Sequence, residues 1–139
     1  MMRLNYYLDT SIWIDLLENR NEIHLNKGEL AQKLLDTIIN DNDTIILSDL
    51  VIEELENNGI TWFEFENLIN SIKRLLEFDE SKLDFIGRAK HISLMRKIPK
   101  NDVLHALIAR DNNAILITRD KHFQHLTDII KHKKPEELL

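Results

Sequence analysis

The chain has 139 residues, of which 43% are hydrophobic and 30% are charged, and its formal net charge is −6 at pH 7. This length and composition predict one folded domain over residues 1–139 and exclude a disordered chain. The absence of cysteine excludes disulfides and thiolate metal sites, and the acidic balance disfavours nonspecific nucleic-acid binding driven by overall charge.

No segment approaches the roughly 20 consecutive apolar residues that a membrane-spanning helix needs. Asp9 and Asp15 interrupt the one apolar region near the N-terminus, so a signal peptide is not expected. We therefore expect a cytoplasmic protein that makes no contact with a membrane.

The spacing of apolar residues predicts strands and helices that alternate along the chain. We expect strands at Tyr6–Leu8, 44–47 and 114–118. We expect helices from about Ser11, around 30–38, from Ser48 to about 57–59, and over 62–76, 81–95 and 102–111. Residues 75–78 could instead form a short strand between two of these helices. Continuously apolar strands separated by helices predict an α/β fold, in which a parallel sheet is covered on both faces.

Acids follow two of the predicted strands. Asp9 comes directly after the first strand, and Asp120 lies two residues after the last one. Ligands of such sheets bind beyond the carboxyl ends of the strands, so a site is expected here. The local alternative is that Asp9 and Asp120 only cap the helices that follow them.

Two further acids open or line predicted helices. Glu54 lies three and four residues after Val51 and Leu50, on the apolar face of its helix, where a carboxylate is unfavourable unless it is paired or binds a cation. The alternative is a side chain that reaches water at the edge of that face. Asp102 opens a helix and shares a face with Ala106, and its alternative role is a favourable interaction with the helix dipole.

These four acids are expected near one edge of the sheet, with no cationic residue placed to neutralise them all. Clustered carboxylates raise the pKa of one another, and a hard divalent cation relieves that repulsion. Ligation by oxygen alone suits Mg²⁺ or Mn²⁺. Such an ion can activate a water and stabilise charge on a phosphodiester, so phosphodiester hydrolysis is the predicted chemistry.

Four stretches of the chain, LDTSIWI, LSDLVIEEL, NDVLHALIA and ILITRDKHF, occur in the order and approximate spacing of PIN domains. Over essentially its whole length the chain resembles the VapC toxin nucleases of that family. The resemblance implies that four acids are catalytic and bind metal: Asp9, Glu54, Asp102 and Asp120. It also implies that nearby hydroxyl groups steady the acids or the substrate: Thr10, Ser11 and Thr118. Leu107 and Ile108 are bulkier than the small residues usual there, which implies slightly different helix packing.

The resemblance further implies a three-layer α/β/α fold around a short central parallel sheet. The implied activity is endoribonuclease cleavage of RNA by a metal-activated water, with one or two Mg²⁺ or Mn²⁺ ions. The implied partners are the RNA substrate, a second copy in a homodimer, and an antitoxin protein that binds near the active site.

Basic residues surround the predicted acidic site in the sequence. Five precede Asp102 and two flank Asp120: Arg88, Lys90, Arg96, Lys97 and Lys100, then Arg119 and Lys121. Lys100 and Arg119 are the best candidates for holding RNA phosphates, while the alternative for each is an ordinary solvated helix face.

The histidines show no ligand pair on one helical turn, so we do not expect metal ligation by His91, His105 or His122. Residues 131–134 are expected in a solvated C-terminal segment.

Three other functions remain compatible with parts of the pattern. A housekeeping RNA-processing PIN nuclease would share the chemistry without being a toxin. A phospho-acceptor receiver domain also gathers acids at a sheet edge. It needs a lysine after a late strand and an acceptor Asp on a central strand, and neither is convincing here; the TRDKHF stretch does not suit it either. A catalytically silent module would bind RNA or protein without cleaving RNA.

Overall fold

The computed structural model describes residues 3–139 of the chain. Within that range the strands form one parallel sheet in the order β3-β2-β1-β4-β5. The strands are β1 (Asn5–Leu8), β2 (Thr44–Ser48), β3 (Leu76–Asp79), β4 (Ile115–Ile117) and β5 (His132–Lys133). The predicted short parallel sheet is therefore confirmed.

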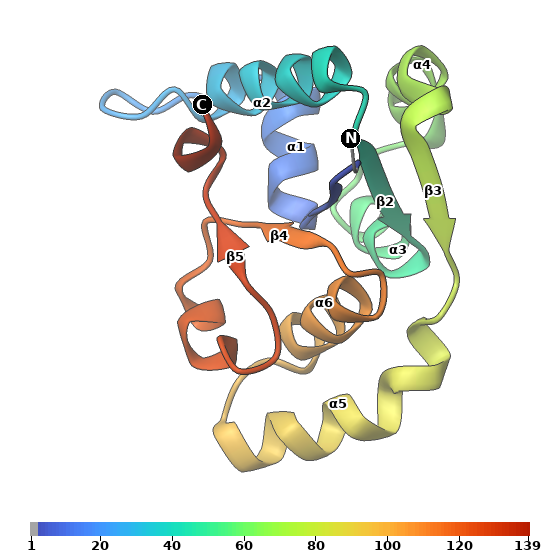
Figure 1. Cartoon of the computed structure of the whole chain (residues 1–139), viewed down its shortest axis with the longest axis vertical. Helices are drawn as coiled ribbons and strands as arrows, with labels where there is room; N and C mark the ends of the chain where they lie inside the picture. Colours follow the sequence, from blue (N-terminus) through green and yellow to red (C-terminus); the bar gives the residue numbers. More distant parts are fainter. Residues whose placement is uncertain (1–2) are drawn as a thin grey trace.

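Helices cover both faces of this sheet (Figure 1). The α-helices are α1 (Thr10–Glu18), α2 (Lys27–Asp41), α3 (Asp49–Asn57), α4 (Trp62–Ile72), α5 (Lys82–Arg96) and α6 (Lys100–Asp111). The short 3₁₀ helices are η1 (Lys73–Leu75), η2 (Lys121–Leu126) and η3 (Pro135–Leu138). Helix α1 packs against α2, α3 and α4, whereas α5 packs along α6. The expected three-layer α/β/α arrangement is confirmed.

The middle strands are buried on both faces, as a parallel sheet between two helical layers requires. Tyr7 on β1 and Ile45 and Ile46 on β2 have no exposed surface. Trp13 on α1 is also fully buried, and its ring meets the edge of Phe65 at a centroid distance of 5.4 Å. Across residues 3–139, none of the helices has both the length and the apolar composition of a membrane span.

Two predicted elements differ from the structure. The helix expected over 62–76 ends at Ile72, and the alternative strand is the one that forms, as β3. The expectation of a solvated segment at 131–134 is wrong, because β5 pairs with β4 and the Thr118 amide donates to the Lys133 carbonyl at 2.9 Å. A two-residue strand held by backbone bonds leaves no apolar pattern in the sequence.

Gly28, in the first turn of α2, allows the connection after α1 to pack tightly against that turn. Its amide donates to the Arg20 carbonyl at 2.6 Å, and a methyl group on Gly28 would lie 2.6 Å from the backbone of Asn19. We expect Gly28→Ala to destabilise the fold by about 1–3 kcal/mol, because backbone atoms must move to relieve the clash. Urea denaturation followed by circular dichroism measures the change.

Gly87, exposed in the middle of α5, is the matched control because a methyl group there has no atom within 4 Å. We expect Gly87→Ala to stabilise the fold by about 0.5–1 kcal/mol through the higher helix propensity of alanine. Equal effects of the two substitutions would contradict a close contact at Gly28.

Candidate active site

The candidate site lies where the chain changes from one face of the sheet to the other. The connection from β1 to β2 carries α1 and α2, whereas β4, on the other side of β1, is reached through α5 and α6. Such a switch point leaves a crevice at the carboxyl ends of the two central strands. Asp9 follows β1 and Thr118 follows β4, and the Asp9 amide donates to the Ile117 carbonyl at 3.0 Å.

Asp9 is held by hydrogen bonds on both carboxylate oxygens. The Thr118 hydroxyl donates to Oδ2, while the Ser11 hydroxyl at 2.7 Å and the Ile12 amide at 3.2 Å donate to Oδ1. The hydrogen bond from Ile12 makes Asp9 the N-cap of α1. The helix cap that the sequence offered as an alternative role therefore forms, and Asp9 lies in the candidate site as well. Burial raises the pKa of the Asp9 carboxyl, and the opposing hydrogen bonds do not cancel that effect.

Glu54 projects from α3 into the same region and accepts three hydrogen bonds. His105 Nε2 lies 2.5 Å and Thr10 Oγ1 2.6 Å from Oε1, and Asn101 Nδ2 lies 3.2 Å from Oε2. Burial, the largest influence, raises the pKa of Glu54, but these hydrogen bonds, that from His105 first, lower it to about 2. Its neighbour Glu53 is exposed and pairs with Lys82 instead.

Asp102 and Asp120 meet at the other end of the site, with His122 between them. Asp102 stands in the first turn of α6, and Asp120 caps η2 by accepting the His122 amide at 2.9 Å. His122 Nδ1 lies 2.8 Å from Asp102 Oδ2 and 3.2 Å from Asp120 Oδ1. Burial and the charge of Asp120 raise the pKa of Asp102, and the hydrogen bond to Asp102 raises the pKa of His122.

The structure brings the four predicted acids into one open cleft of about 140 Å³. The residues that line the cleft are Asp9, Thr10, Ser11, Glu54, Asp102, His105 and Asp120. This lining contains four carboxylates and neither lysine nor arginine.

The donor set fits a divalent cation. Asp102, Asp120 and His122 each offer one ligand atom, and these atoms lie within 4.8 Å of one another. Carboxylate oxygens are the ligands that Mg²⁺ and Mn²⁺ prefer, and an imidazole nitrogen also suits transition metals. Burial raises the pKa of Asp9 and of Asp102, so a cation beside them would favour their ionised form.

The other predicted residues lie at different distances from this cleft. Thr118 is buried beside it and also accepts the Asp120 amide at 3.0 Å. Arg119 forms a two-contact ion pair with Glu136 at 2.8 and 2.9 Å and lines a separate cavity of about 100 Å³. Lys100 is exposed at the start of α6 and does not line the cleft.

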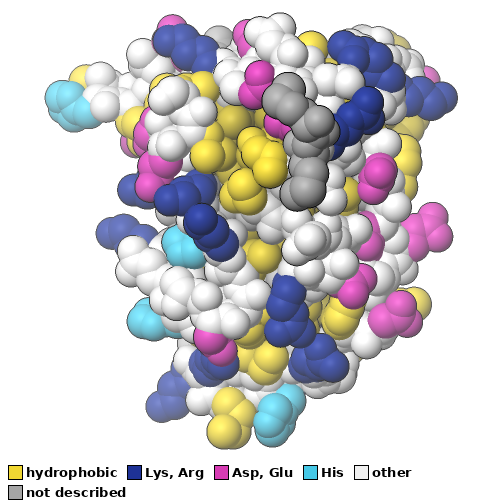
Figure 2. All heavy atoms as spheres, viewed as in Figure 1, with side chains coloured by type: hydrophobic (Ala, Val, Ile, Leu, Met, Phe, Trp, Pro, Cys, Tyr) yellow, Lys and Arg dark blue, Asp and Glu magenta, His cyan; other side chains and the backbone are white. Residues whose placement is uncertain are grey.

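Exposed basic side chains nevertheless occur on α5, the helix that packs along α6. Figure 2 shows lysine and arginine side chains over much of this face, including the part occupied by α5 and α6, whereas acids are frequent along the edge near β3. On α5 and just after it, the exposed bases are Arg88, Lys90, Arg96 and Lys97. Arg96 is already paired with Asp128 at 2.8 Å.

Two groups at the site were not foreseen from the sequence. His122 lies between two acids, and His105 contacts Glu54 and, through Nδ1 at 2.6 Å, the hydroxyl of Tyr7. The only advance signal for His105 was a polar side chain in the apolar run 103–109, and for His122 its place two residues after Asp120. Both contacts depend on packing between distant elements, which periodicity does not reveal.

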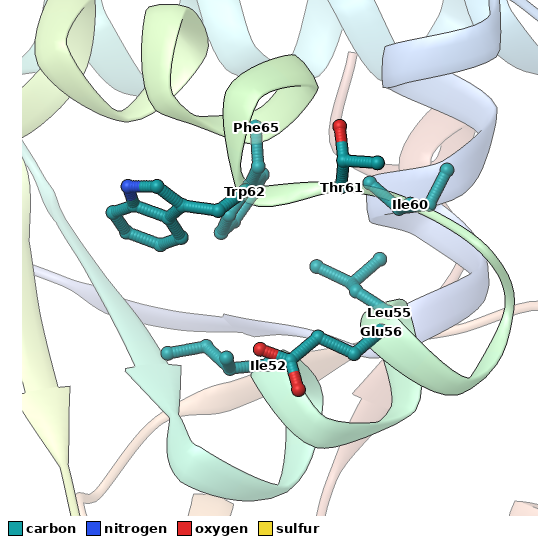
Figure 3. A pocket seen from close by; sticks show the side chains of 7 residues that line it. All are labelled: Ile52, Leu55, Glu56, Ile60, Thr61, Trp62 and Phe65. Atoms are coloured by element: carbon teal, nitrogen blue, oxygen red, sulfur yellow. The ribbon is translucent and has the colours of Figure 1, made fainter.

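An apolar hollow opens between α3 and α4, on the helix that carries Glu54. Figure 3 shows Trp62 and Phe65 of α4 across this hollow from Ile52 and Leu55 of α3. Half of the surface of Trp62 is exposed here, so the hollow presents an aromatic wall to solvent.

Solved structures of several bacterial proteins are similar to this chain. VapBC2 from Rickettsia felis, bound to a DNA fragment from its promoter, superposes with a TM-score of 0.67 at 21% identity and covers 94% of this chain and 98% of that one. VapBC-1 from nontypeable Haemophilus influenzae superposes with a TM-score of 0.64 at 23% identity and covers 96% of this chain and 99% of that one. A chain of a toxin–antitoxin complex from Klebsiella pneumoniae superposes with a TM-score of 0.64 at 18% identity and covers 94% of this chain and 97% of that one.

At these identities the structural similarity establishes the fold alone, and no curated protein shows significant similarity to the sequence. The family is established by a sequence model. The model of the PIN domain matches residues 6–129, which is most of the chain, and this protein therefore belongs to the PIN domain family.

Proposed function

We propose that this protein is a metal-dependent endoribonuclease and acts as the toxin of a type II toxin–antitoxin pair. The observation that carries the proposal is the convergence of four carboxylates in one cleft at the switch point of a PIN fold. Asp9, Glu54, Asp102 and Asp120 would hold one or two Mg²⁺ or Mn²⁺ ions there. A divalent ion in this cleft would supply Lewis-acid stabilisation of a phosphodiester and would lower the pKa of a water.

Neighbouring side chains hold the proposed metal ligands in place through hydrogen bonds. Ser11 and Thr118 fix both oxygens of Asp9, and Thr10 and Asn101 donate to Glu54. These donors orient the acids without neutralising them, so the negative charge remains for a cation. His122, between Asp102 and Asp120, is placed to add a nitrogen ligand or to hold a proton beside the substrate.

The toxin assignment is supported by the complexes in which similar folds occur. The similar chain from Klebsiella pneumoniae belongs to a toxin–antitoxin complex, and the hollow between α3 and α4 offers an apolar surface for a partner protein on the helix that carries Glu54. A small gene for an antitoxin next to the gene for this protein would favour a toxin over a housekeeping nuclease. We place the activity in the cytoplasm, where both RNA and such an antitoxin are accessible.

A homodimer forms part of the same proposal. Large apolar side chains are exposed on α4 and α5: Trp62 and Phe63 on the first, and Leu83, Leu94 and Met95 on the second. Exposed apolar groups of this size are characteristic of association surfaces.

The nuclease proposal is tested first with Asp9→Asn. Asparagine also caps helices well, so the fold is expected to remain while a carboxylate of the cleft is lost. We expect purified, antitoxin-free protein to cleave a mixed RNA pool with Mn²⁺ and not with EDTA. The variant should cleave at least about 100-fold more slowly, since it loses a proposed metal ligand.

Asp128→Asn is the matched control, because Asp128 is exposed and pairs with Arg96 on the surface. It should cleave like the wild type. Folded wild-type protein that cleaves no RNA with Mn²⁺ would favour a silent binding module.

Asp102→Asn tests whether the cleft is under electrostatic strain without metal. The pKa of Asp102 is raised in the fold, first by burial and then by the charge of Asp120. The folded protein therefore favours the protonated carboxyl. This contribution to the free energy of unfolding is present below the ordinary pKa of aspartate and is lost as the pH rises through the pKa in the fold. At neutral pH we therefore expect the variant to melt at a higher temperature than the wild type in EDTA. Excess Mn²⁺ should reverse that order, because the ion stabilises the state that binds it.

Differential scanning fluorimetry measures both melting temperatures. Asp128→Asn again serves as the control, since the hydrogen bond from Arg96 lowers the pKa of Asp128 and its loss should give no gain in EDTA. A lower melting temperature of Asp102→Asn in EDTA would contradict electrostatic strain at that position.

Lys100→Ala tests the proposed contact with RNA phosphates. Lys100 is exposed at the start of α6, next to Asn101, which donates to Glu54. We expect KM to rise by roughly 3- to 10-fold with kcat unchanged, and the slope of log KM against log salt to fall by about 1. Lys33→Ala on α2 is the control and should change neither KM nor its dependence on salt. A fall in kcat for Lys100→Ala would contradict a role in binding alone.

A further inference from the structure

A line of buried polar groups runs from the centre of the sheet to Glu54. Ser48 Oγ lies 2.7 Å from the Tyr7 hydroxyl, the hydroxyl lies 2.6 Å from His105 Nδ1, and His105 Nε2 lies 2.5 Å from Glu54 Oε1. Ser48 and Tyr7 have no exposed surface, and His105 is only 3% exposed. Buried polar groups of this kind are unfavourable unless every one of them is hydrogen-bonded.

One assignment of protons satisfies the whole line. A carboxylate can only accept, so Nε2 of His105 carries a hydrogen and donates it to Glu54. Ser48 Oγ accepts the Val51 amide at 3.1 Å, which leaves its own hydrogen for the oxygen of Tyr7. The Tyr7 hydroxyl then donates to Nδ1, and the imidazole is satisfied as the neutral tautomer with its hydrogen on Nε2.

The line joins elements that the backbone holds apart. Tyr7 belongs to β1, Ser48 ends β2 and caps α3, and His105 stands on α6. Glu54 is anchored on α3, yet His105 and Asn101, which hold its carboxylate, belong to α6. A glutamate side chain that is 22% exposed could turn toward water if these donors were absent.

We infer that His105 is a positioning residue that aims the Glu54 carboxylate into the cleft, and that Tyr7 and Ser48 fix the tautomer that lets it do so. The inference rests on the proposed function only in taking Glu54 as a ligand of the metal. In metal sites, a second layer of hydrogen bonds orients the ligands and tunes their affinity in the same manner.

Titration of the full chain with Mn²⁺ alone, followed by calorimetry, tests this role without depending on catalysis. His105→Leu removes the donor, and we expect Mn²⁺ to bind about 10- to 100-fold more weakly. His105→Gln keeps an N–H that can reach Glu54, so it should recover part of the lost affinity. A residue needed only for packing would give no such recovery.

Tyr7→Phe, with Tyr6→Phe as its control, is the second test and applies also if His105→Leu does not fold. Tyr6 and Tyr7 are neighbours on β1 whose side chains point to opposite faces of the sheet, so the two variants lose the same group on different sides. We expect Tyr7→Phe to bind Mn²⁺ several-fold more weakly, and Tyr6→Phe to bind it as the wild type does.

The outcomes separate the two proposals. Wild-type protein that fails to bind Mn²⁺ would overturn the proposed metal-dependent function itself. If the wild type binds Mn²⁺ but a folded His105→Leu binds it equally well, or His105→Gln binds no better than His105→Leu, the positioning role is overturned. Equal affinities of Tyr7→Phe and Tyr6→Phe would overturn the part assigned to Tyr7.

Discussion

The burial of carboxylates gathered in one cleft is the constraint on which the rest of the site depends. Burial raises the pKa of Asp9 and Asp102, so the fold holds these acids in surroundings that disfavour their ionised form. Glu54 is the exception, because its hydrogen bonds outweigh its burial and lower its pKa to about 2. The cleft therefore combines one acid that is ionised throughout the ordinary pH range with others whose ionisation a cation would favour.

The sheet topology allows acids from separate strands and helices to meet at one edge of the sheet. Asp9 caps α1, Asp102 stands in the first turn of α6, and Asp120 caps η2, so three of the acids meet the amino ends of helical segments. Unpaired amide groups and the helix dipole favour negative charge at those ends. The capping role and the place in the cleft are thus compatible, since the amides at these helix ends also favour the negative charge.

The sequence was sufficient to predict the sheet, its helical cover and the acids at its edge, because apolar periodicity and strand ends are local features. It could not predict β5, since the pairing of His132 and Lys133 with β4 leaves no apolar pattern in the sequence. It also missed His105 and His122, whose partners lie 51 and 20 residues away along the chain. Arg119 was expected beside the phosphates, but its ion pair with Glu136 depends on how the C-terminal segment folds back.

The acids of the cleft are held by neutral donors, which leaves their negative charge available to a cation. Asp9 and Glu54 are held by hydroxyl, amide and imidazole donors, whereas arginine and lysine pair with acids outside the cleft, as Arg119 does with Glu136. A lysine or arginine within hydrogen-bonding distance would lower the pKa of the cleft carboxylates and would also occupy the position of the ion. Neutral donors fix the geometry while the negative charge remains uncompensated. The lining of this cleft contains four carboxylates and neither lysine nor arginine, so these acids remain available to a cation.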